Sequence, residues 1–293
     1  MRVLTFGSDA TIFDAESAAH TRMRAYADAI GELHILSFAN PWTKEERYGN
    51  LFLYPIFASK IFRVSALTSR ARKLILEKGI EIVSAQDPFE HGLAALRAAR
   101  HTNAKLHIQV HTDFLSPWFT KGNFRTAFLN RFRRSIADYV LPSADGIRVV
   151  SQRIKNSLIK HYGFRIPGPS LIPIAINTTP PDAEQLPKHD FAFVLIAVGR
   201  LEPEKRIEDI LTAMKFVTKK YPKTGFFIAG DGHERRELEN LTRTLGLGKN
   251  VVFLGNRPDA WELMKSAQAF IQASAYEGYG RTLIEAALAR VPI

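Results

Sequence analysis

The sequence predicts an α/β protein made of two doubly wound domains, and three observations lead to this fold class. Short β-rich runs alternate with helix-periodic runs through residues 1–177, the pattern of a parallel sheet with crossover helices. A segment rich in proline and polar residues, 178–190, then interrupts the pattern and has the composition of a linker. The alternation resumes over 191–293, so we predict a second domain there.

The first domain is predicted from five β-rich runs and the amphipathic runs between and after them. The expected strands are 3–6, 33–37, 81–85, 106–110 and 147–150. The expected helices are 20–30, 67–77, 90–100, 124–138 and 152–161. Because each strand but the last is separated from the next by at least one helix-length stretch, parallel pairing is favoured.

The second domain repeats this alternation. Its expected strands are 191–198, 225–229, 251–254 and 269–272, and its expected helices begin near residues 207, 235, 260 and 283. A doubly wound domain of this kind usually has about six strands. We therefore expect the second domain to be incomplete at its C-terminus.

Composition limits the chemistry. The chain has 293 residues and no cysteine, which excludes disulfides, thiolate zinc sites and thiol nucleophiles. No apolar run approaches the roughly 20 residues of a membrane-spanning helix. The net charge of +11 favours anionic partners. We expect a cytoplasmic protein.

The first motif is residues 199–205, which connect a buried-type strand to an amphipathic helix. Gly199 lets the backbone approach an anion, while Arg200 and Lys205 supply full positive charges near a helix start. The alternative is a surface loop whose basic residues are only solvated.

The second motif, Gly230-Asp231-Gly232, ends the strand 225–229. Glycines at this position can contact a ligand through the backbone. They can equally serve only to reverse the chain direction.

The third motif is residues 277–285, which open a short apolar helix. The free N–H groups of such a helix start can bind a diphosphate, and the carboxylates of Glu277 and Glu285 can accept hydrogen bonds from sugar hydroxyls. The alternative is that Glu277 interacts favourably with the helix dipole and Glu285 is solvated.

Together, these motifs resemble the retaining, metal-independent glycosyltransferases of family four, whose two Rossmann-like domains face each other across a cleft (the GT-B architecture). The resemblance also includes Phe253-Leu254-Gly255 and covers nearly all of the second half. It implies that Arg200 and Lys205 bind the donor diphosphate, that Glu277 contacts the transferred sugar and that Glu285 holds the ribose hydroxyls. The other expected donor contacts are Gly199, Gly230, Asn256, Gly278, Tyr279, Gly280, Arg281 and Thr282.

In the first half, the resemblance rests on the strand 106–110, which runs into His111-Thr112-Asp113, and on Val149-Val150-Ser151. Family members have a histidine at that strand end beside the transferring sugar. His111 is therefore expected to bond a sugar hydroxyl or position the acceptor, with a purely structural histidine as the alternative. The family's paired-glycine loop after the first strand is replaced here by Gly7-Ser8-Asp9.

The resemblance implies a nucleotide-sugar donor, a glycan or lipid-linked acceptor, and neither a cofactor nor a metal. Two alternatives stay open: a sugar-nucleotide epimerase of the same architecture, and an inactive nucleotide-sugar-binding module. No nucleic-acid-binding motif accompanies the positive charge, so nucleic acid is not expected as a partner.

Residues 121–134 mix aromatic and basic side chains. Phe124, Phe128, Leu129 and Phe132 alternate with Lys121, Arg125, Arg131, Arg133 and Arg134. This pattern suits a helix lying on an anionic membrane surface, which would make the protein peripheral at the inner face of the membrane. A helix that packs on its own sheet and leaves its basic face solvated is the more common arrangement for such a pattern.

Overall fold

The structure is a computed structural model of the chain, and it describes residues 1–7, 9–121, 124–176, 186–257 and 259–293. The chain divides into two compact units, Met1–Pro173 and Ile174–Ile293. Each unit is described here by itself. Most of the predicted linker, 178–190, lies outside the described residues.

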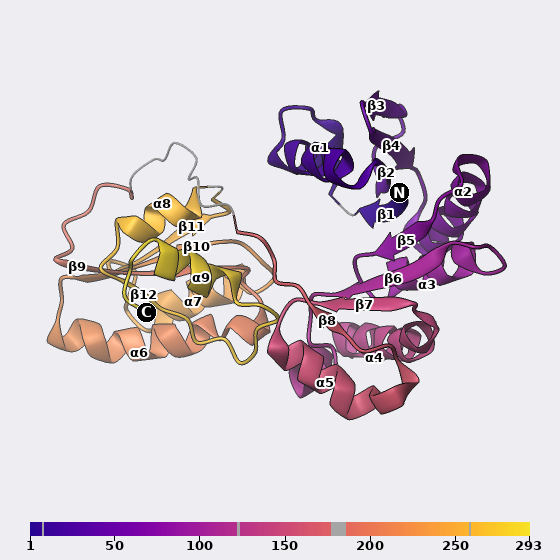
Figure 1. The fold of residues 1–293 in the computed structure, drawn as a ribbon. Helices are drawn as coiled ribbons and strands as arrows, with labels where there is room; N and C mark the ends of the chain where they lie inside the picture. The colour runs from indigo at the N-terminus through magenta and orange to yellow at the C-terminus, as the bar shows by residue number, and fades with distance from the viewer. Residues whose placement is uncertain (8, 122–123, 177–185, 258) are drawn as a thin grey trace. The chain divides into compact units, whose positions relative to one another are not determined.

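The first unit is built on an eight-stranded sheet within its described residues, with the strand order β3-β4-β2-β1-β5-β6-β7-β8 (Figure 1). All neighbours pair in parallel except β3 and β4. The strands are β1 Arg2–Gly7, β2 Glu32–Phe38, β3 Glu46–Tyr48, β4 Leu51–Ile56, β5 Ile82–Ala85, β6 Lys105–Val110, β7 Gly146–Val149 and β8 Ser170–Leu171.

Helices cover both faces of this sheet. The α-helices are α1 Ala18–Ile30, α2 Arg63–Lys78, α3 Glu90–Ala99, α4 Phe124–Val140 and α5 Gln152–Tyr162, and the 3-10 helix η3 spans Pro117–Thr120. Helix α1 buries Ala27 against Val3, Ile35 and Leu53. Because side chains alternate along a strand, Phe6 points to the opposite face, where its ring lies 6.3 Å from that of His91 on α3.

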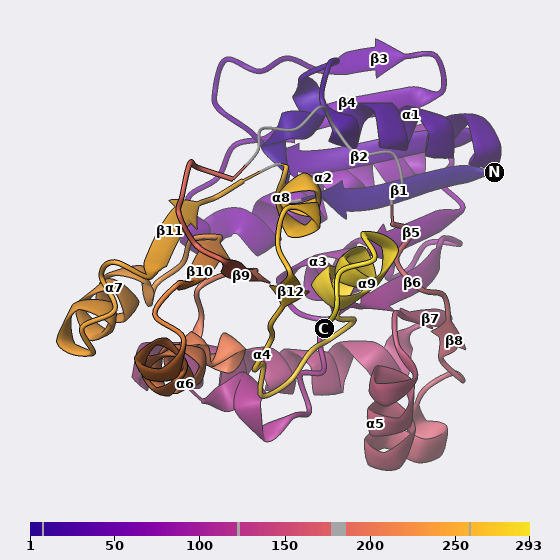
Figure 2. The same ribbon diagram turned by 90° about the vertical axis from the view of Figure 1, so that its left-hand side faces the viewer.

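The second unit has a four-stranded parallel sheet in its described part, ordered β11-β10-β9-β12. Its strands are β9 Phe193–Val198, β10 Thr224–Ala229, β11 Val251–Gly255 and β12 Ala269–Phe270, and its helices are η6 Pro203–Lys205, α6 Ile207–Lys220, α7 Arg235–Thr244, α8 Ala260–Lys265 and α9 Arg281–Leu288. Helices α6 and α7 pack on one face and α8 and α9 on the other, as Figures 1 and 2 show. The unit is therefore doubly wound.

Burial of aromatic side chains stabilises the second sheet. Phe226 and Phe227 are neighbours on β10, point to opposite faces and are at most 1% exposed. Complete burial of such a side chain contributes about 1.5–3 kcal/mol. The strand β10 is buried along its whole length, which fixes the position of the loop that follows it.

Every predicted strand and helix is confirmed to within a few residues, but three strands were not predicted. Strands β3 and β4 lie between two predicted elements, and β8 has only two residues. Strand β4 contains Pro55, which lacks the N–H that a sheet ladder needs. The antiparallel β3 also makes the first sheet mixed, where the sequence suggested a wholly parallel one.

Candidate functional site

A small pocket lies at the carboxyl ends of β9 and β12 in the second unit. Its wall includes Gly199, Arg200 and Lys205 of the first predicted motif, together with Gln272 and Ser274. Ligands of doubly wound domains bind at the carboxyl ends of parallel strands. The pocket therefore has both the position and the positive charge of an anion-binding site.

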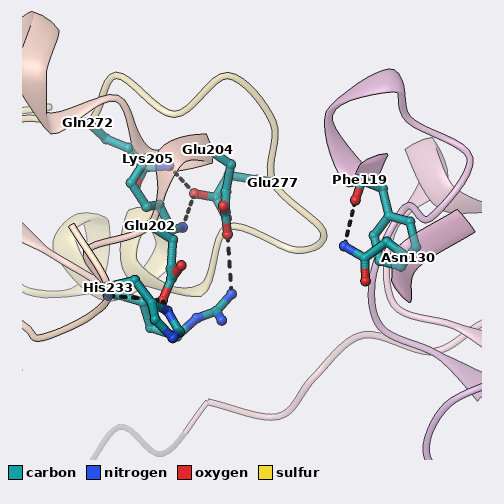
Figure 3. A network of polar contacts seen from close by, with 9 residues as sticks. Phe119, Asn130, Glu202, Glu204, Lys205, His233, Gln272 and Glu277 are labelled. Atoms are coloured by element: carbon teal, nitrogen blue, oxygen red, sulfur yellow. Dashed lines mark hydrogen bonds and ion pairs between the residues drawn. The ribbon is translucent and has the colours of Figure 1, made fainter. Parts of the chain in front are cut away.

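Lys205 joins two of the predicted motifs. Its Nζ lies 2.5 Å from Glu277 Oε1, although 72 positions separate the two residues. Both side chains are largely buried, at 17% and 25% exposure. Figure 3 shows Lys205 and Gln272 converging on the Glu277 carboxylate.

Gln272 holds this carboxylate from the other side. Its Nε2 donates to Glu277 Oε1 at 2.8 Å, and its Oε1 accepts a hydrogen bond from Thr282 Oγ1 at 3.1 Å. Thr282 belongs to the first turn of α9. The network therefore joins the N-terminus of α9 to the loop that follows β9.

The guanidinium group of Arg200 is directed elsewhere. Its Nη2 lies 3.4 Å from Glu204 Oε1, and its side chain is 74% exposed. Arg200 thus supplies a mobile charge at the pocket rim, while Lys205 supplies an ordered one.

Gly230 has a clear structural reason to be glycine. Its φ is +147°, and a Cβ atom built there would lie 1.8 Å from the Gly199 carbonyl oxygen. Gly232 is as restricted, since its Cβ would lie 2.3 Å from the Leu201 carbonyl oxygen. These approaches let Leu201 donate its N–H to the Asp231 carbonyl at 2.9 Å. They favour the chain-reversal role for the motif and need no ligand contact to explain its glycines.

The helix predicted in the third motif is α9. It begins at Arg281, two residues before the expected start. Gly280 precedes it with φ +74° and makes no side-chain cap. Arg281 Nε lies 2.6 Å from Glu285 Oε1, and the Glu285 side chain is only 13% exposed. Glu285 is thus an ion-paired residue in the described structure, on a separate contact from Glu277.

The remaining predicted donor contacts follow strand ends of the same sheet. Asn256 is exposed directly after β11. Gly278 precedes Tyr279, whose hydroxyl donates to the Ile174 carbonyl at 3.2 Å within the second unit. Because all four strands are parallel, Asn256 lies on the same sheet edge as Gly199 and Gly230.

His111 lies in the first unit, directly after β6. Its Nε2 is 3.2 Å from Gln109 Oε1. Burial lowers the pKa of His111 from its ordinary value of 6.5, and the Arg148 guanidinium lowers this pKa further, against an opposing effect of Asp87. His111 is therefore neutral at pH 7.

The sequence did not single out Gln272 or Ser274. Gln272 was the last residue of a predicted strand, and β12 ends two residues before it. Ser274 Oγ is buried without a hydrogen-bond partner among the described residues. The available signal was a polar side chain just beyond a buried strand, which is a common feature of loops.

Helix α4 exposes most of the apolar side chains of its first half. The exposed fractions are 84% for Phe124, 67% for Phe128, 44% for Leu129 and 60% for Phe132. Asn130 Nδ2 donates to the Phe119 carbonyl on η3 at 2.7 Å (Figure 3), while Arg133 pairs with Glu90 at 2.9 Å. Helix α4 packs against the rest of the first unit through its C-terminal half, where Ile136, Ala137 and Val140 are buried.

The part of the chain that the structure describes lacks two further features. No three His, Asp or Glu side chains there come together in a way that could hold a metal ion. No helix of that part combines the length and apolar character needed to cross a membrane.

Two doubly wound units, the second with a basic pocket at its strand ends, are typical of nucleotide-binding enzymes, and the comparisons specify the family. The family model "Glycosyltransferase Family 4" matches residues 15–179, and "Glycosyl transferases group 1" matches residues 179–293. The chain belongs to glycosyltransferase family 4.

The relatives and solved structures agree with this assignment. An uncharacterised glycosyltransferase of Methanocaldococcus jannaschii is 23% identical over 91% of this chain and 69% of that protein. The alpha-monoglucosyldiacylglycerol synthase of Acholeplasma laidlawii is 24% identical over 83% of this chain and 65% of that protein. The chain thus spans about two thirds of the length of these curated relatives.

The fold is shared with structures of GT-B glycosyltransferases. Anabaena HepE in complex with UDP-glucose superposes with a TM-score of 0.71 at 19% identity, covering 100% of this chain and 79% of that one. WaaG, a glycosyltransferase involved in lipopolysaccharide biosynthesis, gives a TM-score of 0.69 at 16% identity, covering 99% of this chain and 80% of that one.

Proposed function

We propose that the protein is a retaining glycosyltransferase that moves a sugar from a nucleoside diphosphate sugar to a hydroxyl group of a glycan or lipid-linked acceptor. The observation that carries the proposal is the ordered Lys205–Glu277–Gln272 network at the strand-end pocket. It places a cation suited to a phosphate beside a carboxylate suited to sugar hydroxyls. Anabaena HepE forms a complex with UDP-glucose, and the Acholeplasma laidlawii relative is an alpha-monoglucosyldiacylglycerol synthase, which supports these substrate classes.

In this proposal, the bond between the anomeric carbon and the diphosphate oxygen breaks, and the acceptor oxygen bonds to the same face of the sugar. Negative charge grows on the leaving diphosphate, which takes up the proton of the acceptor hydroxyl. Lys205 and Arg200 gain interaction energy with the diphosphate as its charge grows. A well-placed donor of this kind stabilises a transition state by about 3 kcal/mol.

We also propose that no cofactor and no divalent metal is required, because Arg200 and Lys205 supply the positive charge next to the diphosphate. Glu277 orients the transferred sugar and Glu285 the ribose, once the donor displaces part of the ion pairing seen for each. Activity retained in excess chelator supports this proposal, and activity restored only by a divalent cation contradicts it.

The deciding experiment is calorimetry with a panel of nucleoside diphosphates and nucleotide sugars. The double variant Arg200→Ala/Lys205→Ala is expected to lose binding of the diphosphates that the wild type binds. The matched control is Lys215→Ala/Arg236→Ala, which removes two exposed cations of α6 and α7. Equal binding by all three proteins would show that the phosphate assignment is wrong.

Product analysis separates this proposal from its alternatives. Sugar transferred to an added acceptor supports a transferase, and retention of the anomeric configuration supports the stereochemical part. A changed free nucleotide sugar indicates an epimerase. Donor binding without turnover, under conditions where acceptors of both classes are present, indicates a binding module.

We further propose that the acceptor is reached at an anionic membrane surface, with α4 lying on the lipid. Phe124 and Phe128 are exposed one helical turn apart, with ring centroids separated by 6.5 Å. Arg125 and Arg131 are exposed on the same helix. Exposed aromatic side chains beside arginines are suited to the boundary between acyl chains and anionic headgroups.

A further inference from the structure

A line of polar side chains runs along one face of the first unit's sheet and ends at His111. His107, Gln109 and His111 alternate along β6 and beyond it, so they share a face. Ser84 on β5 and Arg148 on β7 flank this line. Both neighbouring strands therefore contribute a polar partner to it.

The orientation of the Gln109 amide follows from Arg148. Arg148 Nη1 lies 2.9 Å from Gln109 Oε1, and an arginine side chain can only donate. The amide atom facing Arg148 must therefore be the oxygen. The amide nitrogen then faces Ser84 Oγ at 3.2 Å, to which it donates.

The protonation of His111 follows from Gln109. The same Oε1 atom lies 3.2 Å from His111 Nε2. Because this oxygen can only accept, Nε2 must carry the hydrogen. In the neutral ring the other nitrogen, Nδ1, is then an acceptor, and no described residue donates a hydrogen bond to it.

Arg148 is itself held firmly. Its Nε donates to the Ile172 carbonyl at 3.0 Å and its Nη2 to the Pro173 carbonyl at 2.9 Å. Two backbone contacts and the Gln109 contact engage all three nitrogen atoms of the guanidinium group. Arg148 and His111 therefore both donate to Gln109 Oε1, and the fixed guanidinium group leaves this amide one orientation.

We propose that Gln109 and Arg148 are positioning residues that hold His111 in its Nε2–H tautomer, so that Nδ1 accepts a hydrogen bond from a hydroxyl group of the bound sugar. This inference rests on the proposed function for the identity of the hydroxyl. The opposite tautomer would present an N–H group and would favour a different orientation of that hydroxyl. Burial lowers the pKa of the ring most, the positive charge of Arg148 lowers it further, and the more weakly acting Asp87 opposes both effects, so the ring is neutral.

The test uses nitrogen NMR of the whole chain with ¹⁵N-labelled histidine, with the His111 signals assigned by their loss in His111→Asn. The wild type is expected to show the Nε2–H tautomer. Gln109→Met, of similar length but without the acceptor oxygen, is expected to show a mixture of tautomers. Gln109→Glu keeps an acceptor oxygen and is expected to restore the Nε2–H form.

Kinetics provide the second readout. Gln109→Met is expected to lower kcat/KM for the nucleotide sugar by about tenfold or more, with unchanged affinity for the free nucleoside diphosphate. Arg148→Met is expected to shift the acid limb of the pH–rate profile to higher pH, because the ring loses a neighbouring positive charge. Arg148→Lys keeps the positive charge and is expected to show a smaller shift than Arg148→Met.

A wild-type Nδ1–H tautomer overturns the proposal, and so does an unchanged tautomer with unchanged kcat/KM in Gln109→Met. A transfer rate of His111→Asn equal to that of the wild type also overturns it, since transfer would then not depend on a hydrogen bond from the sugar to the His111 ring. A chain that transfers no sugar from any donor contradicts the proposed function instead. In that case, the NMR readout still decides whether Gln109 and Arg148 select the tautomer.

Discussion

Lys205 Nζ and Glu277 Oε1 lie 2.5 Å apart and form an ion pair between the loop after β9 and the segment before α9. Under the proposed function, the donor phosphate and the Glu277 carboxylate compete for the same ammonium group. This competition gives the two residues different expected effects on binding.

Glu277→Gln is expected to bind the free nucleoside diphosphate at least as tightly as the wild type, because Lys205 loses its competing carboxylate. Lys205→Met is expected to weaken this binding about tenfold or more, since a charge-assisted hydrogen bond contributes about 1.5–3 kcal/mol. Both variants are expected to lower kcat about 100-fold or more. Calorimetry and initial rates measure these effects, with Lys215→Met as the control, and weaker diphosphate binding by Glu277→Gln would contradict the competition.

Gly230→Ala is expected to lower the free energy of unfolding of the second unit by about 2 kcal/mol or more. The new methyl group would overlap the Gly199 carbonyl oxygen, and φ is +147°. Urea denaturation measures the change. The control is Gly248→Ala in the same unit, where an added Cβ meets no atom within 4 Å, and equal stability of the two variants would argue against the close approach.

Helix α4 is expected to bind vesicles that contain phosphatidylglycerol and not vesicles of phosphatidylcholine alone. Co-sedimentation at increasing salt measures the electrostatic part, which is screened at high ionic strength. Phe124→Ser/Phe128→Ser and Arg125→Glu/Arg131→Glu are each expected to abolish most of the binding. Phe216→Ser is the control, because Phe216 is 70% exposed on α6. An equal loss of vesicle binding in this control would contradict a specific role of α4.

The stability of the first unit is expected to fall as the pH decreases from 7.5 to 5.5. Burial lowers the pKa of His34, His107 and His111 below the unfolded value of 6.5. The unfolded chain therefore binds more protons in this range, so acid favours unfolding. Urea denaturation at several pH values measures the slope.

His34→Phe provides a variant for this prediction, because the His34 ring stacks on Phe52 at 4.5 Å and an aromatic ring can be kept there. The slope of stability against pH is expected to become shallower, whatever the absolute stability. His101→Gln, at an exposed position, is the control and is expected to keep the wild-type slope. An unchanged slope in His34→Phe would mean that His34 has the same pKa in the folded and the unfolded chain.

Much of the fold was predictable because its signals are local. Sequence patterns predicted α6, α7, α8 and α9 of the second unit, and buried runs predicted its strands. The short strand β3 carries no such signal, since Glu46, Arg47 and Tyr48 join the sheet only as the antiparallel partner of β4. The sequence left the exposure of Phe124 and Phe128 open, because periodicity shows that a helix has an apolar face but not what covers it.

The sequence by itself determined the ends of β9, β10 and β11 to within one residue, and with them the positions of Gly199 and Lys205 after β9. Tertiary structure alone decided that Gln272 contacts Glu277 and that Arg148 orients Gln109 toward His111. A strand and its end are set by neighbouring residues along the chain. Contacts such as Lys205–Glu277 instead depend on where parallel strands bring distant loops, a position that no local pattern contains.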